Sequence, residues 1–127
     1  MSHANSEIQN VERAPYELFR LVAKLGVTSV DSPLSSEQRQ IAEAIEHHAN
    51  TATNTILNGI EAIGRAISCA ALNPNWKLSS TNLSDLGGVI THLAVEAQAL
   101  HDTADDIRCD LARTADAASK TNQGARA

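Results

Sequence analysis

The clearest hydrophobic pattern lies between residues 82 and 119, where apolar side chains recur at alternating intervals of three and four residues. The series consists of Leu83, Leu86, Ile90, Leu93, Ala97, Leu100, Ala104, Ile107, Leu111, Ala115 and Ala118. This spacing places one apolar stripe along a helix and is typical of a coiled coil. Because Asn82, with Asp85 three residues later, supplies a cap, we expect a helix over about 82–119.

A second long helical pattern precedes it. Its apolar or stripe positions are Ile41, Ile45, His48, Ala52, Ile56, Gly59, Ile63, Ala66 and Ala70, a helical rather than a strand period. Ser35 and Gln38 have the spacing of a capping box, in which each side chain satisfies a backbone N–H of the other residue. Asn73-Pro74 ends the pattern, so the sequence predicts a helix over about 35–72.

A short helix is expected over about 15–25. Pro15 suits a first turn, and Gly26 is a natural stop after the apolar positions of the segment. Residues 1–13 carry no helical period and are interpreted as a flexible lead-in, and 121–127 as a flexible tail. The remainder, 14–120, is interpreted as a single domain.

These elements predict an all-α fold whose body is a long antiparallel hairpin of two helices of roughly 37 residues. The connector over 73–81 is too short for any other arrangement of neighbouring helices. A two-helix hairpin leaves part of each apolar stripe uncovered, and the short helix shields only one end. Pairing of two hairpins into a homodimeric, four-helix-bundle-like assembly would cover the remainder.

The apolar stripes of the two long helices are therefore interpreted as an oligomer seam. The predicted seam residues are Ile41, Ile45, Ala52, Ile56, Ile63, Leu86, Ile90, Leu93, Ala97, Leu100, Ile107 and Leu111. Self-association through this seam makes the chain itself the first expected partner.

Composition narrows the possible functions. A formal net charge of −5 and an aromatic content of 2% argue against direct nucleic-acid binding, which needs basic surface and stacking platforms. No stretch approaches the roughly 18 apolar residues needed to span a bilayer, so no membrane partner is expected. The two cysteines, Cys69 and Cys109, lie far apart along the chain and are interpreted as free thiols of a cytoplasmic protein.

Histidine and carboxylate pairs are the first candidates for metal binding. Glu43/His47, His92/Glu96 and His101/Asp105 have the four-residue spacing that puts two side chains on one helical face. In an antiparallel hairpin, His47 and His48 come level with residues near 105–108, so His48 is expected within reach of the third pair. The favoured interpretation is that these are surface residues, that His48 is a core residue that helps to fix the register, and that no metal or other cofactor is bound.

Two pairs of acidic residues have a further interpretation. Glu43-x-x-Glu46 and Asp102-x-x-Asp105 resemble the paired acidic motifs of all-helical nucleotide pyrophosphohydrolases, which bind magnesium. That resemblance implies a metal-dependent hydrolase, although in that family the two motifs lie closer together and are joined by basic residues that have no counterpart here. We therefore expect no catalytic residues and no enzyme activity.

The expected function is that of a non-enzymatic protein–protein interaction module, such as an adaptor, a chaperone or an inhibitor, that binds an unidentified protein. Asp102, Asp105, Asp106 and Asp110 form the candidate partner-binding face on the last helix. A narrower alternative makes this acidic face a mimic of nucleic acid, carried by a mobile element, that blocks a nucleic-acid-binding protein.

Gly87-Gly88 falls early in the last helix, where glycine weakens helical structure. A close backbone approach, either of the short helix or of a second subunit, would offset that cost.

Overall fold

A computed structural model describes residues 14–26, 28 and 32–124. Within this part of the chain there are three helices and no strands, so the expected all-α fold is confirmed. The helices are α2 (Ala14–Leu25), α3 (Ser36–Ala71) and α4 (Ser80–Gly124). The lead-in predicted over 1–13 lies outside the described residues.

The short helix α2 ends as its sequence indicates. The N–H of Gly26 donates to the carbonyl of Val22 at 3.3 Å, and Gly26 has a φ of 69°, which favours glycine. Leu18, Leu21 and Leu25 form the buried face of the helix, one turn apart along it. These three leucines attach α2 to the long helices.

Helix α3 begins with the predicted capping box. The hydroxyl of Ser35 accepts from the N–H of Gln38 at 3.2 Å, and the Gln38 side chain accepts from the N–H of Ser35 at 3.0 Å. Two backbone donors that the helix itself leaves unpaired are thereby satisfied. At its other end α3 stops at Ala71, one residue before the predicted boundary.

Replacing Ser35 by alanine is expected to lower the free energy of unfolding by about 1 kcal/mol, because the hydroxyl that accepts from the N–H of Gln38 is lost, while the backbone N–H of residue 35 is retained. Urea unfolding followed by circular dichroism measures this change. Ser36→Ala is the matched control, since Ser36 is the first helical residue and takes no part in the box. Equal midpoints for the two variants would show that the cap contributes nothing.

Helix α4 differs from the prediction at both ends. It is capped by Ser79, whose hydroxyl accepts from the N–H of Asn82 at 3.1 Å and whose carbonyl accepts from Leu83 at 3.0 Å. Asn82 is therefore inside the helix, and its predicted role as the cap is wrong. The helix also continues through 121–124, part of the segment interpreted as a tail, while 125–127 lie outside the described residues.

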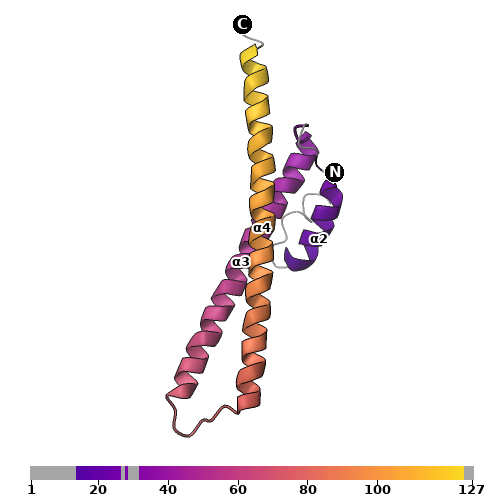
Figure 1. Cartoon of the computed structure of the whole chain (residues 1–127). Coiled ribbons are helices and arrows are strands. Elements are labelled where there is room, and N and C mark those ends of the chain that lie inside the picture. Colours follow the sequence, from indigo (N-terminus) through magenta and orange to yellow (C-terminus); the bar gives the residue numbers. More distant parts are fainter. Residues whose placement is uncertain (1–13, 27, 29–31, 125–127) are drawn as a thin grey trace, which may run out of the picture.

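The long helices form the predicted antiparallel hairpin, and α2 packs against it on one side (Figure 1). Two contacts between distant parts of the sequence fix the register. The Arg108 guanidinium donates to the Glu46 carboxylate at 2.9 Å, and the N–H of Leu34 donates to the Thr114 hydroxyl at 3.1 Å. The first contact agrees with the sequence prediction that residues 47–48 and 105–108 lie at one level.

The core lies where α2 covers the hairpin. Its fully buried members include Ile45 and three alanines, Ala42, Ala49 and Ala104. Figure 1 shows α3 and α4 crossing at this level and diverging towards their connector. Because alanine side chains occupy little space, the two helix axes can approach closely at the crossing. We call residues 52–100, on the connector side of the crossing, the distal half of the hairpin.

Gly87 and Gly88 lie in this distal half and contact no other element. A Cβ added to either glycine would meet nothing within 4 Å. The predicted approach of the short helix to these glycines is therefore wrong, because α2 packs around the crossing instead. The alternative, an approach by a second subunit, stays a prediction.

Candidate interaction surface

The predicted seam residues lie on α3 and α4, and burial within a single chain differs along the stripe. Five of them are buried: Ile41, Ile45, Ala52, Ala97 and Ile107. The other seven are partly exposed: Ile56, Ile63, Leu86, Ile90, Leu93, Leu100 and Leu111. The stripe thus holds the hairpin together, and its role in an oligomer stays a prediction.

Exposed large apolar side chains concentrate in the distal half. The eight such residues among those described are Phe19, Val22, Leu57, Leu72, Trp76, Leu83, Val89 and Val95. Six of the eight lie between residues 57 and 95, and only two belong to α2. Scattered apolar residues are normal on a protein surface, but their concentration on one part of a helical rod is typical of an interaction surface.

Charged residues are sparse in the same region. Of the ten basic and fifteen acidic residues of the chain, only five lie in the distal half: Glu61, Arg65, Lys77, Asp85 and Glu96. Two of these, Glu61 and Arg65, form an ion pair with each other on the surface of α3. Depletion of charge accompanies burial of protein surface in interfaces, because an unpaired charge is costly to remove from water.

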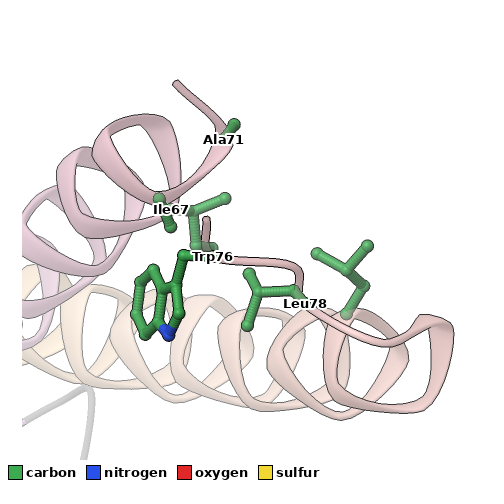
Figure 2. A pocket seen from close by; sticks show the side chains of 6 residues that line it. Ile67, Ala71, Trp76 and Leu78 are labelled. Atoms are coloured by element: carbon green, nitrogen blue, oxygen red, sulfur yellow. The ribbon is translucent and has the colours of Figure 1, made fainter. Parts of the chain in front are cut away.

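An apolar hollow of about 200 Å³ lies at the end of the hairpin, where the long helices diverge. Its lining consists of Ile67, Ala70, Ala71, Trp76, Leu78 and Leu83. Figure 2 shows Trp76 and Leu78 of the connector placed between the end of α3 and the start of α4. Trp76 fills only part of this space and remains 59% exposed. The hollow therefore presents an apolar lining to the solvent.

The first part of the connector next to the hollow, residues 72–76, has its backbone N–H groups satisfied within the chain. Leu72 and Asn73 donate their N–H groups to carbonyls in the last turn of α3, those of Ser68 and Ala70, at 3.3 and 3.1 Å. The N–H groups of Asn75 and Trp76 donate to the side chain and the carbonyl of Asn73, at 3.0 and 3.1 Å, and Pro74 has no N–H. Residues 72–76 can therefore be buried against a partner without leaving a backbone N–H unpaired.

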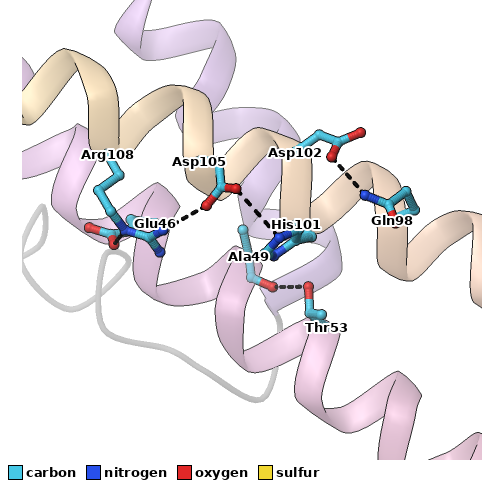
Figure 3. A network of polar contacts seen from close by, with 8 residues as sticks. All are labelled: Glu46, Ala49, Thr53, Gln98, His101, Asp102, Asp105 and Arg108. Atoms are coloured by element: carbon cyan, nitrogen blue, oxygen red, sulfur yellow. Dashed lines mark hydrogen bonds and ion pairs between the residues drawn. The ribbon is translucent and has the colours of Figure 1, made fainter.

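A polar network joins α3 and α4 on the other side of the crossing (Figure 3). Arg108 lies between Glu46, at 2.9 Å, and Asp105, at 2.6 Å. Asp105 in turn lies 3.4 Å from the imidazole of His101. The pKa of Arg108 is raised, mainly by its hydrogen bond to Glu46 and also by the negative charges of Glu46 and Asp105. Partial desolvation of the guanidinium lowers this pKa and so reduces the rise. Arg108 is thus the cation that links the two acidic positions.

The candidate acidic face is divided by these contacts. Asp105 binds Arg108, and Asp110 is half-buried, accepts from the Thr28 hydroxyl at 3.0 Å and pairs with Arg113. Asp102 is exposed and accepts from Gln98 at 2.8 Å, and Asp106 is also exposed. Two of the four aspartates therefore stabilise the fold, and the role of the face as a mimic of nucleic acid stays a prediction.

The candidate metal ligands do not gather at one place. Among the residues that the structure describes, no group of three or more histidine, cysteine, aspartate or glutamate side chains is arranged to hold a metal ion. Of the four acidic residues that resemble pyrophosphohydrolase motifs, Glu46 and Asp105 share Arg108, while Glu43 pairs with Arg39 at 3.0 Å.

The burial of His48 and the exposure of the two cysteines can also be compared with the sequence predictions. His48 is fully buried, as expected for a core histidine, although its effect on the register stays a prediction. Cys69 and Cys109 are both free and exposed. Neither cysteine therefore contributes to the stability of the hairpin through a covalent link.

Comparison of the chain with known protein families, curated proteins and solved structures finds no match. A search of the described helices finds none that combines the length and the hydrophobicity needed to span a membrane. The function therefore has to be argued from the surface itself, and its most distinctive part is the apolar, charge-poor distal half.

Proposed function

We propose that this chain is a non-enzymatic protein–protein interaction module that acts as a helical homo-oligomer. The observation that carries this proposal is the coincidence of exposed apolar residues and sparse charge in the distal half of the hairpin. Burying that surface removes apolar area from water at little electrostatic cost, which is the main driving force of stable association. A second copy is the simplest partner, because it is present wherever the chain is present.

The exposed thiols of Cys69 and Cys109 bear on where such a module would work. Free, exposed cysteines persist in reducing compartments and tend to be oxidised elsewhere. We place the module in the cytoplasm for this reason, with the unidentified protein partner bound by surfaces that self-association leaves free. The exposed pair Asp102 and Asp106 belongs to those surfaces.

The proposal predicts that the chain has a solution mass near twice its 13.5 kDa. Size-exclusion chromatography with light scattering, repeated over a range of protein concentrations, measures this mass directly. A mass that falls towards that of a single chain on dilution indicates a reversible dimer. A mass of one chain at every concentration would contradict the self-association proposed here and would leave the apolar surface to a different partner.

A further inference from the structure

Helix α2 packs against only part of the length of α3. It has 12 residues and is about 18 Å long, whereas α3 has 36 residues and is about 54 Å long at 1.5 Å per residue. This part contains the core around the crossing, where Ile41, Ile45 and Ile107 are buried in one cluster with the leucines of α2. More than half the length of α3 has no third helix against it.

The face of α4 that is buried in the core cluster continues along the helix into the distal half. Residues 18 apart are separated by about five helical turns and lie on the same face of a helix. Val89 and Leu93 are thus the equivalents of Ile107 and Leu111 in the core. Ile107 is only 8% exposed, whereas Val89 is 49% exposed. Val89 and Ile107 thus lie on the same face of α4, but Ile107 is covered by other parts of the chain and Val89 is not.

The same relation holds on α3. Gly59, Ala62 and Ile63 lie 18 residues after Ile41, Ala44 and Ile45, respectively. Ile41 and Ala44 are buried in the core cluster. In contrast, Ala62 is exposed, Ile63 is partly exposed, and a Cβ added to Gly59 would meet nothing within 4 Å. We call the uncovered surface marked by six residues the distal groove: Gly59, Ala62 and Ile63 of α3, and Leu86, Val89 and Leu93 of α4.

We infer that the distal groove is covered by the distal groove of a second copy, packed antiparallel to the first around a two-fold axis. This inference rests on the proposed self-association and names its surface. Residues 59–93 contain two acidic residues, Glu61 and Asp85, and two basic residues, Arg65 and Lys77, so this segment has no net charge. The net charge of −5 therefore belongs to the rest of the chain, where two copies would repel each other.

The dimensions of the groove also fit a second copy. The groove extends beyond these six residues along the whole distal half, over 52–71 of α3 and 80–100 of α4, so its length is about 30 Å, and its width is that of two helices, about 20 Å. An area of about 600 Å² per copy approaches the roughly 800 Å² per partner of a standard stable interface. Two such grooves have equal lengths, and together their four helix segments form a bundle with one continuous core.

Two valine variants test this assignment. Val89→Asp places a charge in the groove, whereas Val95→Asp places the same charge on the same helix but about 120° away around its axis. Both valines are exposed in the single chain, at 49% and 64%, so each variant is expected to keep its helicity, which circular dichroism verifies. We expect the solution mass of Val89→Asp to fall twofold, to that of one chain, and that of Val95→Asp to stay at twice that value.

The outcomes separate the groove from self-association as such. A wild-type chain that is always monomeric overturns both proposals. A wild-type dimer that persists in Val89→Asp, or that dissociates equally in both variants, overturns the groove and leaves self-association in place.

A second measurement does not depend on introducing a charge. In a background with Cys69→Ser and Cys109→Ser, Ala62→Cys lies near the centre of the groove and is expected to form a disulfide-linked dimer under mild oxidation. Val95→Cys, outside the groove, is expected to remain unlinked. Efficient linkage through Val95→Cys and none through Ala62→Cys would also overturn the assignment.

Discussion

Ile45→Ala is expected to lower the free energy of unfolding by about 3 kcal/mol. Ile45 has no exposed surface and lies in the core cluster with Leu21 and Ala104. Its truncation removes buried methyl groups and leaves a cavity among helices that relax only partly. The loss is a large fraction of the 5–15 kcal/mol that stabilises a typical domain. Urea unfolding followed by circular dichroism measures it.

Leu57→Ala is the matched control for this variant. Leu57 belongs to the same helix and has a comparable side chain, but it is half exposed in the distal half. Its truncation at a concentration where the chain is monomeric is expected to cost less than about 1 kcal/mol. Similar losses for the two variants would show that the buried core is not centred at the crossing.

Ala104→Leu is expected to destabilise the hairpin by about 2 kcal/mol, although leucine is the more hydrophobic residue. Ala104 is fully buried about one turn from Arg108, where α3 and α4 cross, and Ala49 is fully buried about one turn from Glu46. A leucine at this position has no space and forces the helices apart or its neighbours out of their rotamers. The midpoint of urea unfolding reports the loss.

Ala99→Leu provides the comparison for this substitution. Ala99 is exposed on the same helix, so the added side chain extends into solvent and the expected change in stability is close to zero. An Ala104→Leu protein as stable as the wild type would mean that the helices are not in close contact at the crossing.

The hairpin could be predicted because the hydrophobic spacing within each long helix and the length of the connector between them indicate the same arrangement. The three and four spacing from Leu83 to Ala118 requires a helix, and the short connector requires an antiparallel neighbour. The start of α4 was harder to place, because Ser79 and Asn82 are both good capping residues separated by one turn. Which of the two is the cap depends on the backbone conformation between Leu78 and Leu83, two residues that also line the hollow. That conformation depends on tertiary packing, which the local sequence does not show.

The candidate acidic face could be predicted only in part. Periodicity places Asp102, Asp106 and Asp110 on one side of a helix, but it gives no information about the segment that leads from α2 to α3. Thr28 in that segment donates its hydroxyl to the carboxylate of Asp110. Likewise, an apolar stripe has the same period whether a helix of its own chain or of a second chain covers it. That is why the seam could be located in the sequence but not assigned to one chain or two.

The angle at which α3 and α4 cross determines how far apart their ends lie at the connector. Ala49 lies 22 residues, or about 33 Å, from the end of α3 at the connector. A change of about 5° in the crossing angle, well within the scatter found for packed helices, displaces that end by about 3 Å. The width of the hollow that Trp76 partly fills therefore depends on the side-chain size of Ala49 and Ala104 at the crossing, although neither residue lines the hollow.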